Sequence, residues 1–260
     1  MAETIRVETD ARGVATLTLA RADKHNALSG KMIGEITEAS RALGADADVR
    51  VVVLAAEGRS FCAGGDLGWM RAQMTADAAT RAAEARKLAE MLEALNSLPK
   101  PLIGRVQGNA FGGGVGLACV CDVTIGVLGS RFGFTETKLG LIPATIGPHV
   151  IARMGAAMAR RVFMSARLFD AEEAVTLGVL ARAVAAEDLD AAVEAEVTPY
   201  LACAPAAVAE AKALARSLGD QPDAQAIDAS IAALVRRWES DEAAEGIAAF
   251  FDKRPAAWTT

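Results

Sequence analysis

The hydrophobic positions of the first sixty residues change their period several times, and each change predicts a new element. Residues 4–9 and 14–20 are alternating or continuous apolar segments with Val and Thr, which predicts two strands. Residues 28–46 repeat apolar side chains at the spacing of one helix face, after a capping Ser29. The run of valines within 50–58 predicts a strand that is buried on both faces.

Strands and helices continue to alternate toward the middle of the chain. A glycine-rich loop is expected at 58–70, followed by a long helix that starts at Thr75 and runs through Leu98, where two prolines end it. Residues 101–108 and 122–127 predict two further strands, with glycines and a short helix between them.

From about residue 145 onward the pattern is almost entirely helical. The last helices, within 204–251, are alanine-rich and amphipathic, and we expect them to cover the core or a neighbouring subunit. Alternating strands and helices followed by a helical last third predict an α/β core with parallel strand pairs and crossover connections.

Composition narrows the class of protein. Of the 260 residues, 52% are hydrophobic, which allows a large core, and the formal net charge of −6 argues against a general nucleic-acid binder. The chain has neither a membrane-length apolar run nor an apolar leader, so we expect a cytoplasmic protein that does not enter membranes. The four cysteines lack metal-ligand spacing; we expect no metal site and reduced, mostly buried thiols at Cys62, Cys119, Cys121 and Cys203.

The segment AFGGGVGLACVCD at 110–122 places three consecutive glycines, and a fourth at Gly116, before an apolar segment. Gly108 and Gly113 have the spacing of a phosphate-binding loop, but Gly114 stands where that loop needs lysine. Glycines at a helix start let a ligand approach backbone N–H groups that have no partner within the helix. Such donors can hold an oxyanion; tight packing of the helix on a sheet explains the glycines equally well.

A second glycine-rich loop, FCAGGDL at 61–67, also follows a buried strand, so the two loops could each supply one N–H to the same oxygen. In this order, FCAGGDL, KPLIGRVQGNAFGGGVGLACVCD and FGFTETKLGLIP resemble the crotonase (enoyl-CoA hydratase/isomerase) superfamily. The resemblance runs from about residue 5 to residue 255 and includes DKHNAL near the start and FFDKR near the end.

The resemblance implies a fold and a substrate. The expected fold is a spiral of ββα repeats over residues 1–200 that carries an acyl-CoA site. Residues 201–260 would form a helical region that organises a homotrimer, or a hexamer of two trimers. The substrate would be an acyl-CoA thioester, and no cofactor is needed because coenzyme A is part of that substrate.

The resemblance also assigns chemistry to single positions. The thioester carbonyl would lie between the backbone N–H groups of Gly65 and Gly113. Hydratases of this family commonly place two glutamates around the attacking water. The second matches Glu136, but the position of the first, three residues after Gly113, holds Gly116. Gly116 would then leave room for a branched or carboxylated acyl group.

Three functions are compatible with a glycine at position 116 in place of the first glutamate. The segment after Glu136 is most similar to hydratases of branched or carboxylated enoyl-CoA thioesters, of the methylglutaconyl-CoA and carboxygeranoyl-CoA type, and this is the function we expect. A single glutamate is also the pattern of Δ3,Δ2-enoyl-CoA isomerases, which is the alternative. The third reading is a CoA-binding or RNA-binding protein without catalysis.

The same resemblance suggests which residues contact the substrate. Coenzyme A would be bound by Lys24, Ala63 and Leu67, and in a neighbouring subunit by Phe251 and Lys253. Trp69 and Met70 would either shape the acyl pocket or pack in the core, and Asp66 is expected to be a loop or cap residue.

Four further polar residues are weighed beside them. Asp122 is expected to be a structural hydrogen-bond partner, and His25 to be incidental. His149 is expected at the surface or in an interface, although it could orient water or bind a distal carboxylate, and Arg153 is considered for the same role.

Overall fold

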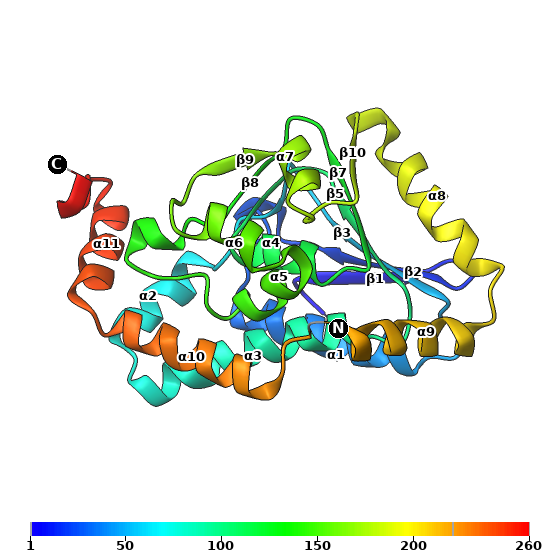
Figure 1. Ribbon diagram of the computed structural model, residues 1–260, viewed down its shortest axis with the longest axis horizontal. Coiled ribbons are helices and arrows are strands. Elements are labelled where there is room, and N and C mark those ends of the chain that lie inside the picture. Colours follow the sequence, from blue (N-terminus) through cyan, green and yellow to red (C-terminus); the bar gives the residue numbers. More distant parts are fainter. Residues whose placement is uncertain (1, 220, 260) are drawn as a thin grey trace.

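A computed structural model describes residues 2–219 and 221–259, and two sheets form its centre (Figure 1). The six-stranded sheet has the order β1 (Ile5–Thr9), β2 (Val14–Leu19), β3 (Val51–Ala56), β5 (Leu102–Val106), β7 (Val123–Val127) and β10 (Arg182–Val184). The four-stranded sheet has the order β4 (Ser60–Cys62), β6 (Asn109–Phe111), β8 (Arg131–Gly133) and β9 (Leu168–Asp170).

From β3 to β8 successive strands alternate between the two sheets, so β3–β4, β5–β6 and β7–β8 each give one strand to each sheet. The pairs β1–β2 and β8–β9 are antiparallel and the other pairs are parallel. Helices follow the strand pairs, which confirms the predicted α/β spiral with its helical C-terminal region.

The helices lie around these sheets. Their bounds are α1 (Gly30–Ala45), α2 (Leu67–Thr75), α3 (Ala78–Asn96), α4 (Gly113–Cys119), α5 (Gly147–Met154), α6 (Ala156–Phe163), α7 (Ala171–Thr176), α8 (Leu189–Leu201), α9 (Pro205–Leu218), α10 (Ala224–Trp238) and α11 (Asp241–Asp252). Short 3-10 helices are η1 (Ala22–Lys24), η2 (Glu136–Leu139), η3 (Ala186–Asp188) and η4 (Ala257–Thr259). Ser29 caps α1 as predicted, since its side chain accepts a hydrogen bond from the Met32 N–H.

Three sequence predictions about the elements were wrong. Thr75 does not begin the long helix: it ends α2, and Asp77 caps α3 by accepting a hydrogen bond from the Thr80 N–H. The expected loop at 58–70 contains β4 and the first turn of α2. The last third is not wholly helical, because β9 and β10 lie in it; three-residue strands are too short to show a period.

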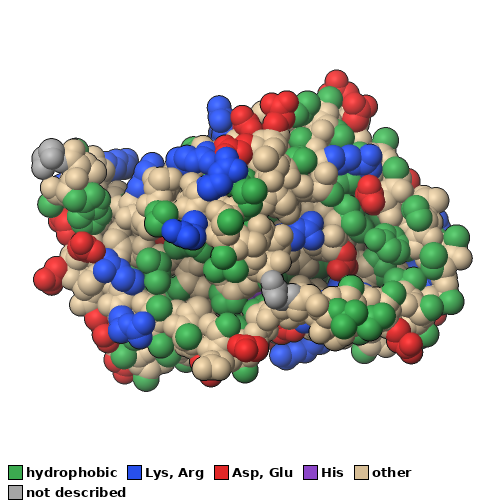
Figure 2. Space-filling model, viewed as in Figure 1, with side chains coloured by type: hydrophobic (Ala, Val, Ile, Leu, Met, Phe, Trp, Pro, Cys, Tyr) green, Lys and Arg blue, Asp and Glu red, His purple; other side chains and the backbone are tan. Residues whose placement is uncertain are grey.

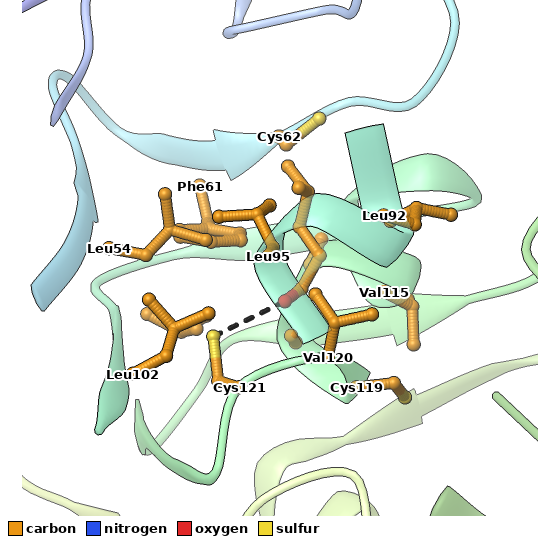
Figure 3. Close-up of a cluster of buried hydrophobic side chains, with 14 of the residues drawn as sticks. Leu54, Phe61, Cys62, Leu92, Leu95, Leu102, Val115, Cys119, Val120 and Cys121 are labelled. Atoms are coloured by element: carbon orange, nitrogen blue, oxygen red, sulfur yellow. Dashed lines mark hydrogen bonds between the residues drawn. The ribbon is translucent and has the colours of Figure 1, made fainter. Parts of the chain in front are cut away.

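The main core lies between the sheets and the helices that follow them, and Figure 3 shows a part of it around α4. All six residues of β3 are buried, as its run of valines predicted. Cys62, Cys119 and Cys121 are buried free thiols in this core, and the Cys121 thiol donates to the Leu117 carbonyl at 3.3 Å. Cys203 is a free thiol too but is exposed, so the four thiols are mostly buried, as predicted.

The C-terminal helices cover different parts of the molecule. The helix α10 runs beside α3, and α11 lies against η2 (Figure 1). A separate apolar cluster joins α8 to the six-stranded sheet. No residue of α9 is buried, so this helix is held mainly by polar contacts. Within the described residues, no helix combines the length and the apolar character that crossing a membrane requires.

Candidate active site

Two tight glycine turns meet at one end of the four-stranded sheet. Gly64 follows β4 with a φ of +92°, and Gly112 follows β6 with a φ of +48°, conformations that side chains rarely allow. A Cβ added at Gly64 would lie 3.1 Å from the Phe111 carbonyl oxygen and 3.9 Å from the Gly113 nitrogen. Because β4 and β6 are hydrogen-bonded neighbours, the sheet itself brings the two turns together.

Each turn presents one free backbone donor. The Leu28 N–H bonds the Gly64 carbonyl at 2.8 Å and the Asp66 N–H bonds the Leu28 carbonyl at 3.0 Å, which holds the backbone on both sides of Gly65. Gly113 is the first residue of α4, where the N–H has no partner in the helix. In the described part of the chain neither the Gly65 nor the Gly113 N–H donates a hydrogen bond, and both glycines line one cavity.

Glu136 reaches this cavity from η2. Its Oε1 lies so close to Gly112 that a Cβ added there would approach it to 2.9 Å. Its Oε2 is buried and has no hydrogen-bond partner among the described residues. Burial raises the pKa of Glu136 to about 7, because the apolar surroundings disfavour the charged carboxylate. A carboxyl group that titrates near neutrality can both accept and return a proton.

The cavity has a volume of about 410 Å³ and a mainly apolar lining. The apolar side chains come from α2, α3, η2, α10 and the chain between them, and include Leu67, Trp69, Met70, Leu88, Leu141, Leu234 and Trp238. Glu136 is the only acidic residue in the described lining, and Lys138 is the only basic one. The Trp69 indole N–H donates to Glu84 at 3.2 Å, which holds that ring in place.

Sequence analysis missed three polar residues of this cavity, Thr135, Lys138 and Thr145, of which Thr145 is the most buried. Thr145 is 5% exposed, and its hydroxyl is buried without a partner in the described chain. It lies in the loop 142–146, which lines the cavity just before α5. A buried hydroxyl without a partner costs free energy unless something in the cavity bonds it. A lone threonine belongs to no spacing pattern, so no sequence signal pointed to it.

Gly116 does not have the role that the sequence suggested. It is not among the residues lining the cavity, and a Cβ added there would lie 2.8 Å from Ile146 Cγ2 and 3.8 Å from Leu92 Cδ2. The space that a glutamate side chain would need is therefore filled by protein. The expectation that Gly116 gives room to the substrate is wrong, because Ile146 occupies that room.

This packing makes a stability prediction. Gly116→Ala should lower the free energy of unfolding by about 1–3 kcal/mol, because the new methyl group meets Ile146 in a fully packed region. In an Ile146→Ala background the same change should cost less than about 1 kcal/mol. Urea unfolding of the four proteins measures both values. Equal costs in the two backgrounds would contradict the contact.

The expected CoA-contacting residues separate into two groups. Ala63, Leu67 and Trp69 line the cavity. Lys24 is exposed on η1 and does not line it, so a contact to a phosphate outside the cavity remains a prediction. Asp66 is the predicted cap: it accepts from the N–H groups of the next helix, α2, and pairs with Arg21 at 3.0 Å.

The end of α11 gives the cavity one residue that the sequence analysis did not name. Phe250, rather than Phe251, lines the cavity. The Phe251 ring lies 4.4 Å from the Arg71 guanidinium, and Lys253 ends α11 with a φ of 55°. Contacts of Phe251 and Lys253 with a neighbouring subunit's nucleotide stay predictions.

His149 and Arg153 lie away from Glu136, in a second cavity. The surface position expected for His149 is wrong, since it is 3% exposed. Arg153 donates to three backbone carbonyls, among them that of Gly178 at 2.9 Å. Neither residue lines the cavity that holds the Glu136 carboxyl, so the structure gives no support for a role of either in orienting water there. The Asp122 carboxylate accepts from the Leu102 N–H at 2.7 Å, which confirms its structural role.

His25 lines neither cavity, although its backbone carbonyl accepts a hydrogen bond at 3.0 Å from the N–H of Ala63, which lines the cavity of Glu136. Its ring nitrogens lie 3.2 Å from an Arg59 guanidinium nitrogen and 3.2 Å from the Ser60 hydroxyl.

Comparison with known proteins gives consistent relatives. The family model described as enoyl-CoA hydratase/isomerase matches residues 9–260. A solved enoyl-CoA hydratase from Shewanella pealeana is 37% identical with a TM-score of 0.81, and the match covers 99% of this chain and 97% of that one. The mitochondrial methylglutaconyl-CoA hydratase of Mus musculus is 30% identical over 256 residues, 96% of this chain and 80% of the mouse protein. The enoyl-CoA hydratase ACTT6 of Alternaria alternata is 35% identical over 205 residues, 78% of this chain and 67% of its own.

Proposed function

The chain belongs to the enoyl-CoA hydratase/isomerase family, and on that basis we propose that it hydrates the double bond of a 2-enoyl-CoA thioester. One observation carries the proposal. A single carboxyl group with a pKa of about 7 lines the cavity that also holds two unpartnered backbone N–H groups. The pairing of an oxyanion site with a proton carrier is what addition to an unsaturated thioester requires.

The proposed reaction uses the two oxyanion donors, the Glu136 carboxylate and one water molecule. The Gly65 and Gly113 N–H groups donate to the thioester oxygen and stabilise the negative charge that develops on it as the enolate forms. The Glu136 carboxylate takes a proton from water, and the hydroxide oxygen bonds to C3 while the C2–C3 π electrons move toward the carbonyl. Glu136 then returns the proton to C2, so one water is added and the carboxylate is regenerated. No separate cofactor takes part.

Thr145 supplies the contact that the missing first glutamate would have made to this water. The buried oxygens of Thr145 and Glu136 belong to the same cavity and neither has a partner in the described residues. A water that bonds both would satisfy them, which is the usual state of buried polar groups. We therefore place the attacking water between the two side chains.

Thr145→Val tests this placement. We expect kcat to fall roughly 3–10-fold, the worth of one neutral hydrogen bond, with unchanged or higher stability because an unpartnered hydroxyl is removed. Steady-state kinetics and thermal unfolding measure the two effects. Thr145→Ser, which keeps the hydroxyl, is the matched control. A fully active valine variant would contradict the water contact.

The nature of the lining bears on the acyl group. Most of the side chains around the cavity are apolar, which favours a hydrocarbon at the acyl end, and the similarity to the mouse methylglutaconyl-CoA hydratase supports a branched one. A carboxylated acyl group, such as 3-methylglutaconyl, would find Lys138 as the basic residue in the described lining. We propose a branched 2-enoyl-CoA substrate, with the methylglutaconyl type as its carboxylated form.

A second activity is favoured by one observation. In the described lining Glu136 has no second carboxylate beside it, and moving a proton between C4 and C2 of a 3-enoyl-CoA needs only one base. This isomerase reaction would use the same oxyanion donors and add no water.

A mass-spectrometric assay in heavy water separates the two activities. It offers 3-methylglutaconyl-CoA, crotonyl-CoA and a 3-enoyl-CoA to the purified protein. Gain of one water on the branched thioester, with little on crotonyl-CoA, supports the hydratase and its substrate class. Conversion of the 3-enoyl thioester without water gain supports the isomerase. Silence on all three substrates would contradict both and favour a binding protein.

We also propose that the protein self-associates as a homotrimer or hexamer. Exposed apolar side chains on α5 and just after α6, including Ile151 and Met164, border an apolar groove on the single chain and support this. Light scattering on the purified protein measures the assembly directly.

A further inference from the structure

A second cavity, of about 510 Å³, lies between α4, α5 and α9, on residues that the proposed reaction does not use. None of the described residues that line it also lines the cavity of Glu136. Figure 2 shows the surface hollowed between α5 and α9, with basic and acidic side chains visible in the hollow. Its volume is within the range of small-molecule sites, about 300–1,000 Å³.

His149 is the most informative residue of this cavity. It is 97% buried, yet both of its ring nitrogens lack a hydrogen-bond partner in the described chain. Burial lowers the pKa of His149. The negative charge of Glu93 acts to raise this pKa, and the positive charge of Arg216 acts to lower it. The neutral ring therefore offers one donor and one acceptor that the protein leaves unused, at a cost that a bound group would remove.

Basic residues predominate around this ring. Lys212 pairs with Asp122 at 2.8 Å, and Arg216 pairs with Glu93 at 2.7 Å through one terminal nitrogen. Among the described residues, Arg153 bonds backbone carbonyls and forms no ion pair, so its positive charge has no paired carboxylate there. Three cations against two carboxylates leave a net positive charge beside the buried ring.

Two further donors complete the site. The Arg216 Nε–H is buried and has no partner within the described residues, although the Nη2 nitrogen of that guanidinium pairs with Glu93. The Tyr200 phenol also lines the cavity, and burial raises its pKa, so the hydroxyl stays protonated. Donors and positive charge without matching acceptors suit an oxyanion.

We propose that this cavity binds a small molecule carrying a carboxylate or phosphate group, held by His149, Arg216 and Tyr200. The proposal is independent of the reaction at Glu136. In the chain, His149 follows by three residues the loop 142–146, which lines the cavity of Glu136.

Nuclear magnetic resonance of the histidine rings tests the proposal, because the protein has only two histidines. Inorganic phosphate and malonate are titrated separately into protein with labelled histidine rings. We expect one of them, at millimolar or lower concentration, to shift the His149 signals with saturation and to leave those of His25 unchanged. The anion that saturates distinguishes phosphate from carboxylate recognition.

Two conservative variants supply the controls. Arg216→Lys keeps the charge but removes the Nε–H, and Tyr200→Phe removes only the hydroxyl; we expect about tenfold and about threefold weaker binding. Hydratase or isomerase turnover should be unchanged in both, which separates this test from that of the proposed function. The proposal would be overturned if neither anion shifted the His149 signals, or if the signals of both histidines shifted linearly with anion concentration. It would also be overturned if both variants bound the anion as tightly as the natural protein. A His149 signal that changes with protein concentration and does not respond to either anion would also overturn the proposal, because a second copy of the protein would then occupy the cavity.

Discussion

Glu136→Gln is expected to lower kcat by about 10²–10⁴-fold, the usual contribution of one general acid–base group. Glutamine has nearly the same shape and can still contact water, but it cannot take a proton and return it. KM should change little, because the oxyanion donors and the apolar lining are untouched. The measurement is steady-state kinetics on the best thioester from the heavy-water assay. Near-normal turnover of the glutamine variant would refute the single-base mechanism.

The pH dependence provides a second readout of the same residue. Only the ionised carboxylate can accept the proton, so the kcat/KM of the natural protein should rise tenfold per pH unit below about 7 and level off above it. The residual activity of Glu136→Gln should lack this limb. A rise centred near pH 4.5 would mean that the carboxyl group is solvated in the working enzyme.

Stability should change in the opposite direction. The pKa of about 7 in the folded protein lies above the ordinary value of 4.5, so the folded state holds the proton more tightly than the unfolded chain. Ionisation therefore lowers stability as the pH rises from 4.5 to 7. Above pH 7 Glu136→Gln should be more stable than the natural protein, by at most about 3 kcal/mol, and near pH 4 the two should be alike.

Gly65→Pro is expected to lower kcat by about 10²–10³-fold, because proline has no N–H and one of the two oxyanion donors disappears. The preceding Gly64 imposes little restriction of its own, and a Cβ at position 65 would lie 3.8 Å from Trp69 and Met70, an ordinary contact. Kinetics with the same thioester measure the loss.

Gly65→Ala is the matched control, since it adds the same Cβ and keeps the N–H. It should retain most of the natural kcat, and both variants should unfold at nearly the natural temperature. Equal losses in the two variants would assign the effect to bulk rather than to the donor. An active proline variant would mean that the thioester oxygen is held elsewhere.

Local patterns were sufficient for much of the fold. The Ser29 cap and the buried valines of β3 are determined within a few residues of sequence, and both were predicted. The start of α3 was misplaced because Thr75 and Asp77 are both good capping residues, and only the structure shows which one caps.

The site was predicted only where backbone geometry determines it. The resemblance to the crotonase superfamily assigned roles to Gly65, Gly113 and Glu136, and all three line one cavity. Contacts between distant segments were out of reach. The packing of Ile146 onto Gly116 joins positions thirty residues apart, and His149 is buried beneath helices that come fifty residues later. No local pattern carries that information.

The donors at Gly65 and Gly113 follow two adjacent strands, β4 and β6, so their separation is fixed by the spacing of a sheet, about 4.8 Å between neighbours. The groups around the acyl chain come instead from α2, η2 and α10, which belong to different parts of the chain. The positions of the two N–H groups that bind the carbonyl are therefore set by the sheet, whereas the residues around the acyl chain can change independently of it. Substitutions in α2 or α10 could change which acyl chain the enzyme accepts and leave the reacting double bond in the same position relative to the two N–H groups.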